Sequence, residues 1–343
     1  MVTQIIANRV YDYSHAIGGR DMMKPYSLAF GSGDVVFLVN RLMSGLAQAR
    51  AGAGIPAQIR KIDMGATPGD EELLASFGVL GEAEDQIYWP AGIACDSNDN
   101  VYIADEWLNR IAVFDGDGHF LRTWGEQGSA EGQLLGPSGL EFDADDNLYV
   151  VDARNHRVQK FTTDGEFIGG WGSQGDGPGQ FDTPWGLTID RNGSVFVADH
   201  KNNRVQKFTP EGEYLMEFGS YGTKVGELNR PTDVAVDPDG DVYVCDWANN
   251  RVNAYEESGK PITSFIGDAE QLSKWQQQFV DSNEGEKLAR RRAVDKEIGW
   301  RLALPTAVEF HPERNWLFIS DYQRGRFQIY AKLQDYDEPQ FNL

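Results

Sequence analysis

The chain is poor in cysteine, in positive charge and in long apolar runs. It has two cysteines among 343 residues, and 53 Asp and Glu residues outnumber 31 Lys and Arg residues, which gives a net charge of −22. Nucleic acids and anionic membranes both require clustered Lys and Arg, so this balance argues against either as a partner. Because no run approaches 18 apolar residues, we expect no membrane span.

The small number of cysteines also indicates the cellular compartment. Cys95 and Cys245 stand at different positions of two distant repeats, so we expect two free thiols, which suits a reducing environment. The segment 1–8 lacks a charged start followed by an apolar core, so no signal peptide is expected and the cytoplasm is the expected location.

One sequence unit recurs every 47 residues. It starts with Pro-x-Gly, continues to Val-Tyr-Val-Ala-Asp-x-x-Asn-x-Arg-Val-x-x-Phe, and closes on Trp-Gly or Phe-Gly. A fixed period of 40–50 residues with four strand-like runs is typical of a β-propeller blade. The regular copies start at Pro90, Pro137, Pro184 and Pro231, and further copies start at Pro25 and Pro305.

These six copies predict an all-β fold, a six-bladed β-propeller of four-stranded antiparallel blades, as one domain over 1–343. Two intervals are longer and predict insertions at 42–69 and 268–304. The first is rich in Ala and Gly and is expected to be a loop, whereas the second is rich in helix formers and predicts a helical insertion between blades 5 and 6. Because 8–13 copies part of the repeat, we expect 3–18 to close the ring as an outer strand beside 326–330.

The Asp and Arg of each unit recur at one spacing, and we interpret them as a hydrogen-bond clamp of the blade.

Two longer stretches, Trp171–Phe181 and Asp199–Phe208, resemble the NHL repeat closely, and the resemblance extends over most of the chain. NHL propellers share a shape but differ in function. Some bind RNA, some bind proteins, some sense ligands, and one branch, the peptidyl-hydroxyglycine amidating lyases, is enzymatic.

The residues that bind zinc in the lyases are not present in this chain. The resemblance implies zinc-binding histidines in the entries of blades 2, 4 and 6, where this chain has Ala91, Trp185 and Thr306, so we expect no metal and no cofactor. Asn40-Arg41 stands where the lyases have a His-Arg pair. The resemblance therefore implies Arg41 as a candidate catalytic residue that grips a substrate carboxylate, and the alternative is a solvated loop arginine.

The residues that vary between blades follow the entry prolines and the loop aspartates, on the face we call the top. They are expected to surround the top mouth of the central channel and to bind a small ligand with an apolar body and an acidic or polar group. The alternative is that aromatic side chains merely seal the channel. The candidate ligand-binding residues are Tyr26, Trp185, Trp247, Tyr322, Trp107 and His156.

Two further sets of side chains are candidates for acid–base chemistry or cation binding. His200 replaces a neutral loop residue and is a candidate acid or base near neutral pH, or else a solvated histidine. Glu141 and Glu309 occupy equivalent positions in blades 3 and 6 and either share a proton or a cation across the channel or are separately solvated.

Two functional hypotheses remain open at this point. One is a small-molecule site at the top mouth, with or without a metal-independent lyase- or hydrolase-like activity. The other is a protein interaction scaffold without catalysis, which uses the top face or the helical insertion with its basic run 290–292.

Overall fold

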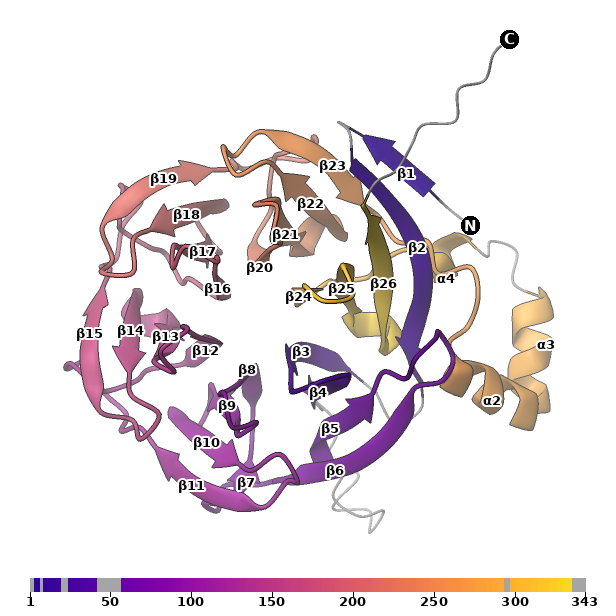
Figure 1. Cartoon of the computed structure of the whole chain (residues 1–343), viewed down its shortest axis with the longest axis horizontal. Coiled ribbons are helices and arrows are strands. Elements are labelled where there is room, and N and C mark those ends of the chain that lie inside the picture. The colour runs from indigo at the N-terminus through magenta and orange to yellow at the C-terminus, as the bar shows by residue number, and fades with distance from the viewer. Residues whose placement is uncertain (1–2, 7–8, 20–23, 42–56, 293–296, 335–343) are drawn as a thin grey trace.

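The computed structural model describes residues 3–6, 9–19, 24–41, 57–292 and 297–334. Six antiparallel blades surround a central channel, and the first strand of each blade lies nearest the axis (Figure 1). The sequence prediction of a six-bladed, all-β propeller is confirmed, as is the helical insertion between blades 5 and 6.

The four regular blades have nearly identical strand lengths. Blade 2 contains β8 (Pro90–Cys95), β9 (Val101–Asp105), β10 (Arg110–Phe114) and β11 (Phe120–Trp124). Blade 3 contains β12 (Pro137–Phe142), β13 (Leu148–Asp152), β14 (Arg157–Phe161) and β15 (Phe167–Trp171). Blade 4 contains β16 (Leu187–Ile189), β17 (Val195–Asp199), β18 (Arg204–Phe208) and β19 (Tyr214–Phe218). Blade 5 contains β20 (Pro231–Val236), β21 (Val242–Asp246), β22 (Arg251–Tyr255) and β23 (Pro261–Phe265).

The two blades at the ring closure each carry an extra strand. Blade 1 contains β3 (Pro25–Phe30), β4 (Val35–Asn40), β5 (Ala57–Asp63), β6 (Glu72–Leu80) and the short parallel β7 (Gln86–Ile87). Blade 6 contains β24 (Val308–His311), β25 (Trp316–Asp321), β26 (Arg326–Leu333), β2 (Arg9–Gly18) and β1 (Thr3–Ile6).

The second strand of each regular blade is buried along its whole length. Successive side chains of a strand point to opposite faces, and in a propeller both faces pack against neighbouring blades. This explains why the second strands read as continuous apolar runs. The core is therefore divided into clusters between blades, such as the one that joins Phe196 of blade 4 to Val244 of blade 5.

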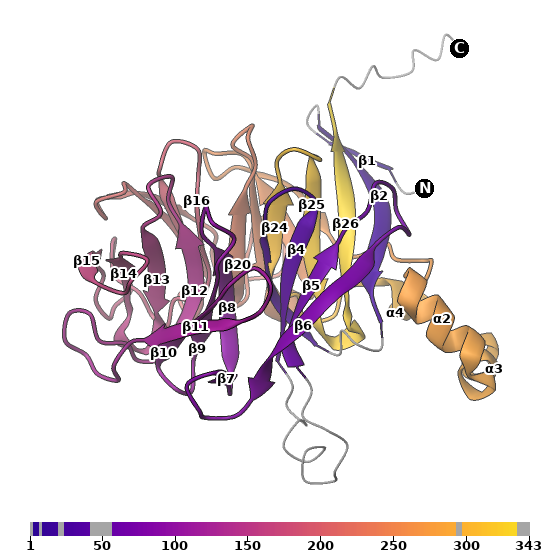
Figure 2. The same cartoon turned by 60° about the horizontal axis from the view of Figure 1, so that its bottom comes forward.

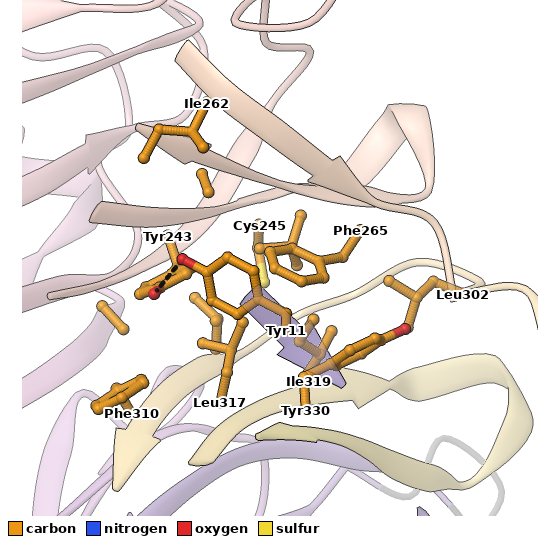
Figure 3. Close-up of a cluster of buried hydrophobic side chains, with 14 residues drawn as sticks. Tyr11, Tyr243, Cys245, Ile262, Phe265, Leu302, Phe310, Leu317, Ile319 and Tyr330 are labelled. Atoms are coloured by element: carbon orange, nitrogen blue, oxygen red, sulfur yellow. Dashed lines mark hydrogen bonds between the residues drawn. The ribbon is translucent and has the colours of Figure 1, made fainter. Parts of the chain in front are cut away.

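The ring is closed by strand β2, which pairs antiparallel with β26 and so covers the edge of blade 6. Tyr11 of β2 inserts between blades 5 and 6, where its hydroxyl is 3.0 Å from that of Tyr243 and its ring packs on Phe265 (Figure 3). Chain ends that are far apart in sequence are thereby joined through one buried aromatic cluster.

The helical insertion contains α2 (Lys274–Ser282), α3 (Glu284–Arg292) and α4 (Glu297–Trp300). Helix α2 begins with a capping box formed by Ser273 and Gln276, and Ser273 also donates to the Gly18 carbonyl at the end of β2. Helices α2 and α3 lie outside the ring, beside β2, so they do not cover the central channel (Figures 1 and 2).

The predicted insertion at 42–69 is too long. Residues 57–63 form β5, the third strand of blade 1, in which Ile59 and Ile62 are fully buried. The Ala- and Gly-rich composition concealed this strand, whose place is set by pairing with β4. The part of the predicted insertion at 42–56 lies outside the described residues.

Two expectations about composition can be compared with the structure. Cys95 and Cys245 are both free thiols. Among the described residues, no helix is long and apolar enough to cross a membrane.

Candidate functional site

The recurring Asp and Arg of the top loops pair with each other in blades 3 to 6. Each Arg Nε donates to the Asp five residues before it, while its terminal nitrogens donate to backbone carbonyls of the preceding top loop. The Asp side chains also accept backbone N–H groups of the same loops. These Asp and Arg side chains bond to one another and to the loop backbone, so they are part of the blade structure. The candidate site residues are the ones that differ between blades.

Trp185 reaches from blade 4 across the channel axis. Its side chain packs against a cluster of blades 1 and 2 that contains Tyr26 and Ala91, and Tyr322 of blade 6 packs against the same cluster. The rings of Tyr26 and Tyr322 are 5.8 Å apart in an edge-to-face arrangement. The structure thus brings together three of the predicted mouth residues from three blades.

His200 lies between two tryptophans on the opposite side of the mouth. Its ring is 5.7 Å from that of Trp185 and 6.4 Å from that of Trp247. Its Nδ1 is 3.0 Å from the Pro231 carbonyl oxygen, and because a carbonyl only accepts, Nδ1 carries the proton. Burial lowers the pKa of His200, so the imidazole is neutral at neutral pH and its Nε2 keeps a lone pair.

Arg41 is already paired in this structure. Its buried guanidinium forms an ion pair with Glu106 and stacks over the rings of Tyr26 at 4.3 Å and Trp89 at 4.6 Å. Glu106 also accepts from Arg154 at 3.0 Å. The catalytic role of Arg41 stays a prediction, but a ligand carboxylate at this point has to compete with Glu106.

Two predicted ligand-binding residues lie away from this cluster. Trp107 is 59 % exposed on the rim and contacts Tyr88, with the ring centroids 5.9 Å apart. His156 has a left-handed backbone, and its Nδ1 accepts from the Thr183 N–H of the next blade at 3.1 Å. Asn residues make the same link between other blades, so His156 acts as a blade-to-blade connector.

Below the mouth, a cavity of about 20 Å³ is lined by the inner strands of all six blades. Trp185 lines its top, and Asp233 and Glu309 contribute carboxylates to its wall. Burial, together with repulsion from Asp233, raises the pKa of Glu141 to about 8, and burial raises the pKa of Asp233 to about 7. Burial and both neighbouring carboxylates also raise the pKa of Glu309.

The raised pKa values of these carboxyl groups make the stability of the folded protein depend on pH. Their pKa values are higher in the folded chain than in the unfolded one, so their contribution is fully present below about pH 4 and is lost as the pH rises to about 8. The groups whose charge interacts with Glu141 include Asp233, Glu309 and the Cys95 thiol, and each of these is acidic.

We therefore expect Glu141→Gln to lose less stability between pH 5 and pH 8 than the parent protein, as measured by urea unfolding. The difference between variant and parent removes the contribution of groups that do not interact with Glu141. Glu257→Gln, on the exposed bottom hairpin, serves as the control and should follow the parent. Equal pH dependence for the Glu141 variant and the parent contradicts the raised pKa.

Sequence reasoning missed two members of the site. Trp89 precedes the entry proline of blade 2, a position outside the aligned variable residues. Asp233 stands at the entry position that holds Gly92, Gly139 and Gly186 in other blades, so its departure from the repeat was visible in the sequence.

Comparisons with known proteins agree on the fold. Residues 134–161, 181–208 and 228–255 match the NHL repeat, and no curated protein sequence matches the chain. A propeller in a nidogen/laminin complex is 21 % identical over 71 % of this chain and 80 % of that chain, with a TM-score of 0.51. A streptogramin B lyase is 12 % identical over 94 % and 97 %, with a TM-score of 0.54.

A catalytically inactive virginiamycin B lyase from Staphylococcus aureus, solved with quinupristin, is 10 % identical over 94 % of this chain and all of that chain, with a TM-score of 0.56. At these identities the neighbours establish the architecture alone. They include a protein-binding propeller and lyases, so the function has to be argued from the side chains of the mouth.

Proposed function

Because this chain carries NHL repeats on a six-bladed β-propeller, we propose that it binds a small polar ligand with an aromatic or apolar body at the top mouth of its channel. The observation that carries this proposal is the environment of His200. Its ring is held between Trp185 and Trp247, and its Nδ1 is bound to the Pro231 carbonyl oxygen. A neutral acceptor flanked by flat aromatic surfaces suits a ligand that combines a donor group with an apolar body.

If the protein is an enzyme, the His200 imidazole is its general base. Nε2 is the acceptor nitrogen of a neutral ring, so it is able to take a proton from a bound substrate without a metal. Under this proposal Tyr26 and Tyr322 form the opposite wall, and Arg41 holds the Tyr26 ring in place. A lyase- or hydrolase-like reaction would then depend on His200.

The proposal is tested by intrinsic tryptophan fluorescence and thermal shift across a panel of small metabolites. We expect a ligand that changes both signals and that binds about tenfold more weakly to Trp247→Leu. Trp107→Leu is the matched control, because the Trp107 ring is exposed and contacts Tyr88. Equal loss in both variants, or no ligand in the panel, counts against the proposal.

The second candidate is a protein interaction scaffold. It is favoured by Trp107, a large exposed aromatic that packs on Tyr88, because Trp and Tyr are enriched at protein interfaces. The two candidates predict opposite outcomes for the same pair of variants. A scaffold loses its partner in Trp107→Leu and keeps it in Trp247→Leu, whereas a small-molecule site shows the reverse.

A further inference from the structure

Resting on the proposed function, we propose that the ligand of the mouth is a protonated primary amine, whose ammonium group enters the channel below Trp185 and pairs with Asp233 and Glu309. This assigns a charge and a chemical class to the ligand. It differs from the expectation that Arg41 grips a substrate carboxylate.

The first argument is the size of the cavity. Its volume of about 20 Å³ is enough for one water-sized group, which requires roughly 10–15 Å³. A primary ammonium head is about as large as a water molecule, whereas a carboxylate or a ring is larger. The cavity therefore selects a small donor group, while the body of the ligand stays above it against Trp185.

The second argument is the shortage of donors for the channel carboxylates. Asp233 accepts the Val308 N–H at 3.0 Å through one oxygen and also accepts a backbone hydrogen bond from Val234. An added Cβ at Gly186, the neighbour of Trp185 in the chain, would meet the other oxygen, so this carboxylate lies close to the backbone at Trp185. Among the described residues, Glu309 and Glu141 have no hydrogen bond and no basic partner that would stabilise their charged forms.

The neighbouring hydroxyl groups do not supply these missing donors. Thr232 Oγ1 donates to the Pro305 carbonyl oxygen at 3.2 Å, and Thr306 Oγ1 is within hydrogen-bond distance of the Ser320 hydroxyl at 3.0 Å and of the Pro25 carbonyl oxygen at 3.4 Å. Glu141, Asp233 and Glu309 are only partly exposed, and withdrawing a carboxylate from water without enough donors is costly. The channel is therefore complementary to a cation that brings three N–H donors.

The third argument is the aromatic mouth. Ring faces attract cations through their quadrupole, and two mouth tyrosines already contact protein cations: Arg41 over Tyr26 at 4.3 Å and Lys24 over Tyr322 at 4.9 Å. The charge of Arg41 is offset by Glu106, so it does not oppose a second cation strongly. An anionic ligand would instead have to displace Glu106 and lie above three acidic groups.

The test compares three probes that differ in one group: 2-phenylethylamine, 2-phenylethanol and 3-phenylpropanoate. Isothermal titration calorimetry at pH 7.5 should show binding of the amine, at least about tenfold weaker binding of the alcohol, and no binding of the carboxylate. Because channel carboxyl groups ionise when the ammonium enters, the amine should also release protons, measured as a difference in heat between two buffers.

The variant Glu309→Gln keeps the shape of the protonated side chain, so it is expected to fold. It should weaken binding of the amine about tenfold and leave binding of the alcohol unchanged, with Asp233→Asn as a second variant. Glu257→Gln, which removes an exposed carboxylate on the bottom face, is the matched control and should bind the amine as the parent does.

The outcomes separate this inference from the proposed function. If the alcohol or the carboxylate binds as well as the amine, and Trp247→Leu weakens that binding, the amine inference is wrong and the mouth remains the site. If none of the three probes binds, the inference is overturned, and the metabolite panel decides on the mouth independently. If Glu309→Gln and Asp233→Asn both bind the amine normally, the ammonium does not enter the channel.

Discussion

Replacing Lys332 by methionine is expected to lower the free energy of unfolding by about 3–5 kcal/mol, because it breaks a buried ion network by removing one partner. The buried ammonium of Lys332, on β26, pairs with Asp237, with Asp239 at 2.8 Å and with Asp241 at 2.9 Å, all in the bottom turn of blade 5. Without it, the buried Asp237 loses its basic partner, and the buried Asp241 keeps Arg9 but loses Lys332.

The position of this network increases the expected effect. Arg9 of the closing strand β2 binds Asp241 through two nitrogens, each at 2.6 Å, so Lys332 and Arg9 both join the closing strands to blade 5. Urea unfolding measures the loss. Lys260→Met is the control, because this exposed lysine forms an i,i+4 pair with Glu256 on the surface, and its loss should change stability by less than about 0.5 kcal/mol. A similar small effect for Lys332→Met would show that blade 6 is held mainly by its apolar core.

Asp246→Ala is expected to cost about 3–5 kcal/mol, because it leaves a buried arginine and several buried donors unpaired. The Asp246 side chain accepts the Asn229 N–H at 2.6 Å and Arg251 Nε at 2.7 Å, as well as the Asn249 and Asn253 amides. Arg251 in turn donates to three carbonyl groups of the preceding top loop, so one carboxylate organises the whole loop.

The control for this second prediction is Asp281→Ala, which removes an exposed carboxylate from α2 and should be nearly neutral. Asp246→Asn should fall between the parent and the alanine variant, since an amide oxygen still accepts but carries no charge. Thermal and urea unfolding of the three variants, followed by circular dichroism, measure the series. An alanine variant as stable as the parent would exclude the clamp interpretation for blade 5.

Much of the fold could be predicted because it repeats. Each copy of the unit contains its own strand pairing and its own loop hydrogen bonds, so one period specifies the blade and the number of copies specifies the ring. The prediction was wrong at 57–63, where the strand β5 lacks the repeat sequence and is recognised only by its pairing with β4.

The candidate site was predictable only in part. The repeat placed Tyr26 and Trp185 after entry prolines, and His200, Trp247 and Tyr322 after loop aspartates. The structure links these residues through three ring contacts and through the cluster that Trp185 shares with Tyr26. The sequence carried no sign that Trp185 crosses the axis.

The sequence also did not reveal which side chains pair with one another. Arg41 belongs to blade 1 and its partner Glu106 to blade 2, 65 residues later. His156 varied between blades, as a site residue does, yet it proved to connect two blades.

The sequence by itself determined the number of blades, the clamp residues shared by them and the positions at which they differ. Local hydrogen bonds and alternation along a strand depend on residues close in the chain, and a repeat displays these directly. Only the tertiary structure decided which variable side chains meet, which charges are already paired and which carboxylates lack a donor. Those properties depend on contacts between side chains of different blades, at the positions where the repeats differ from one another.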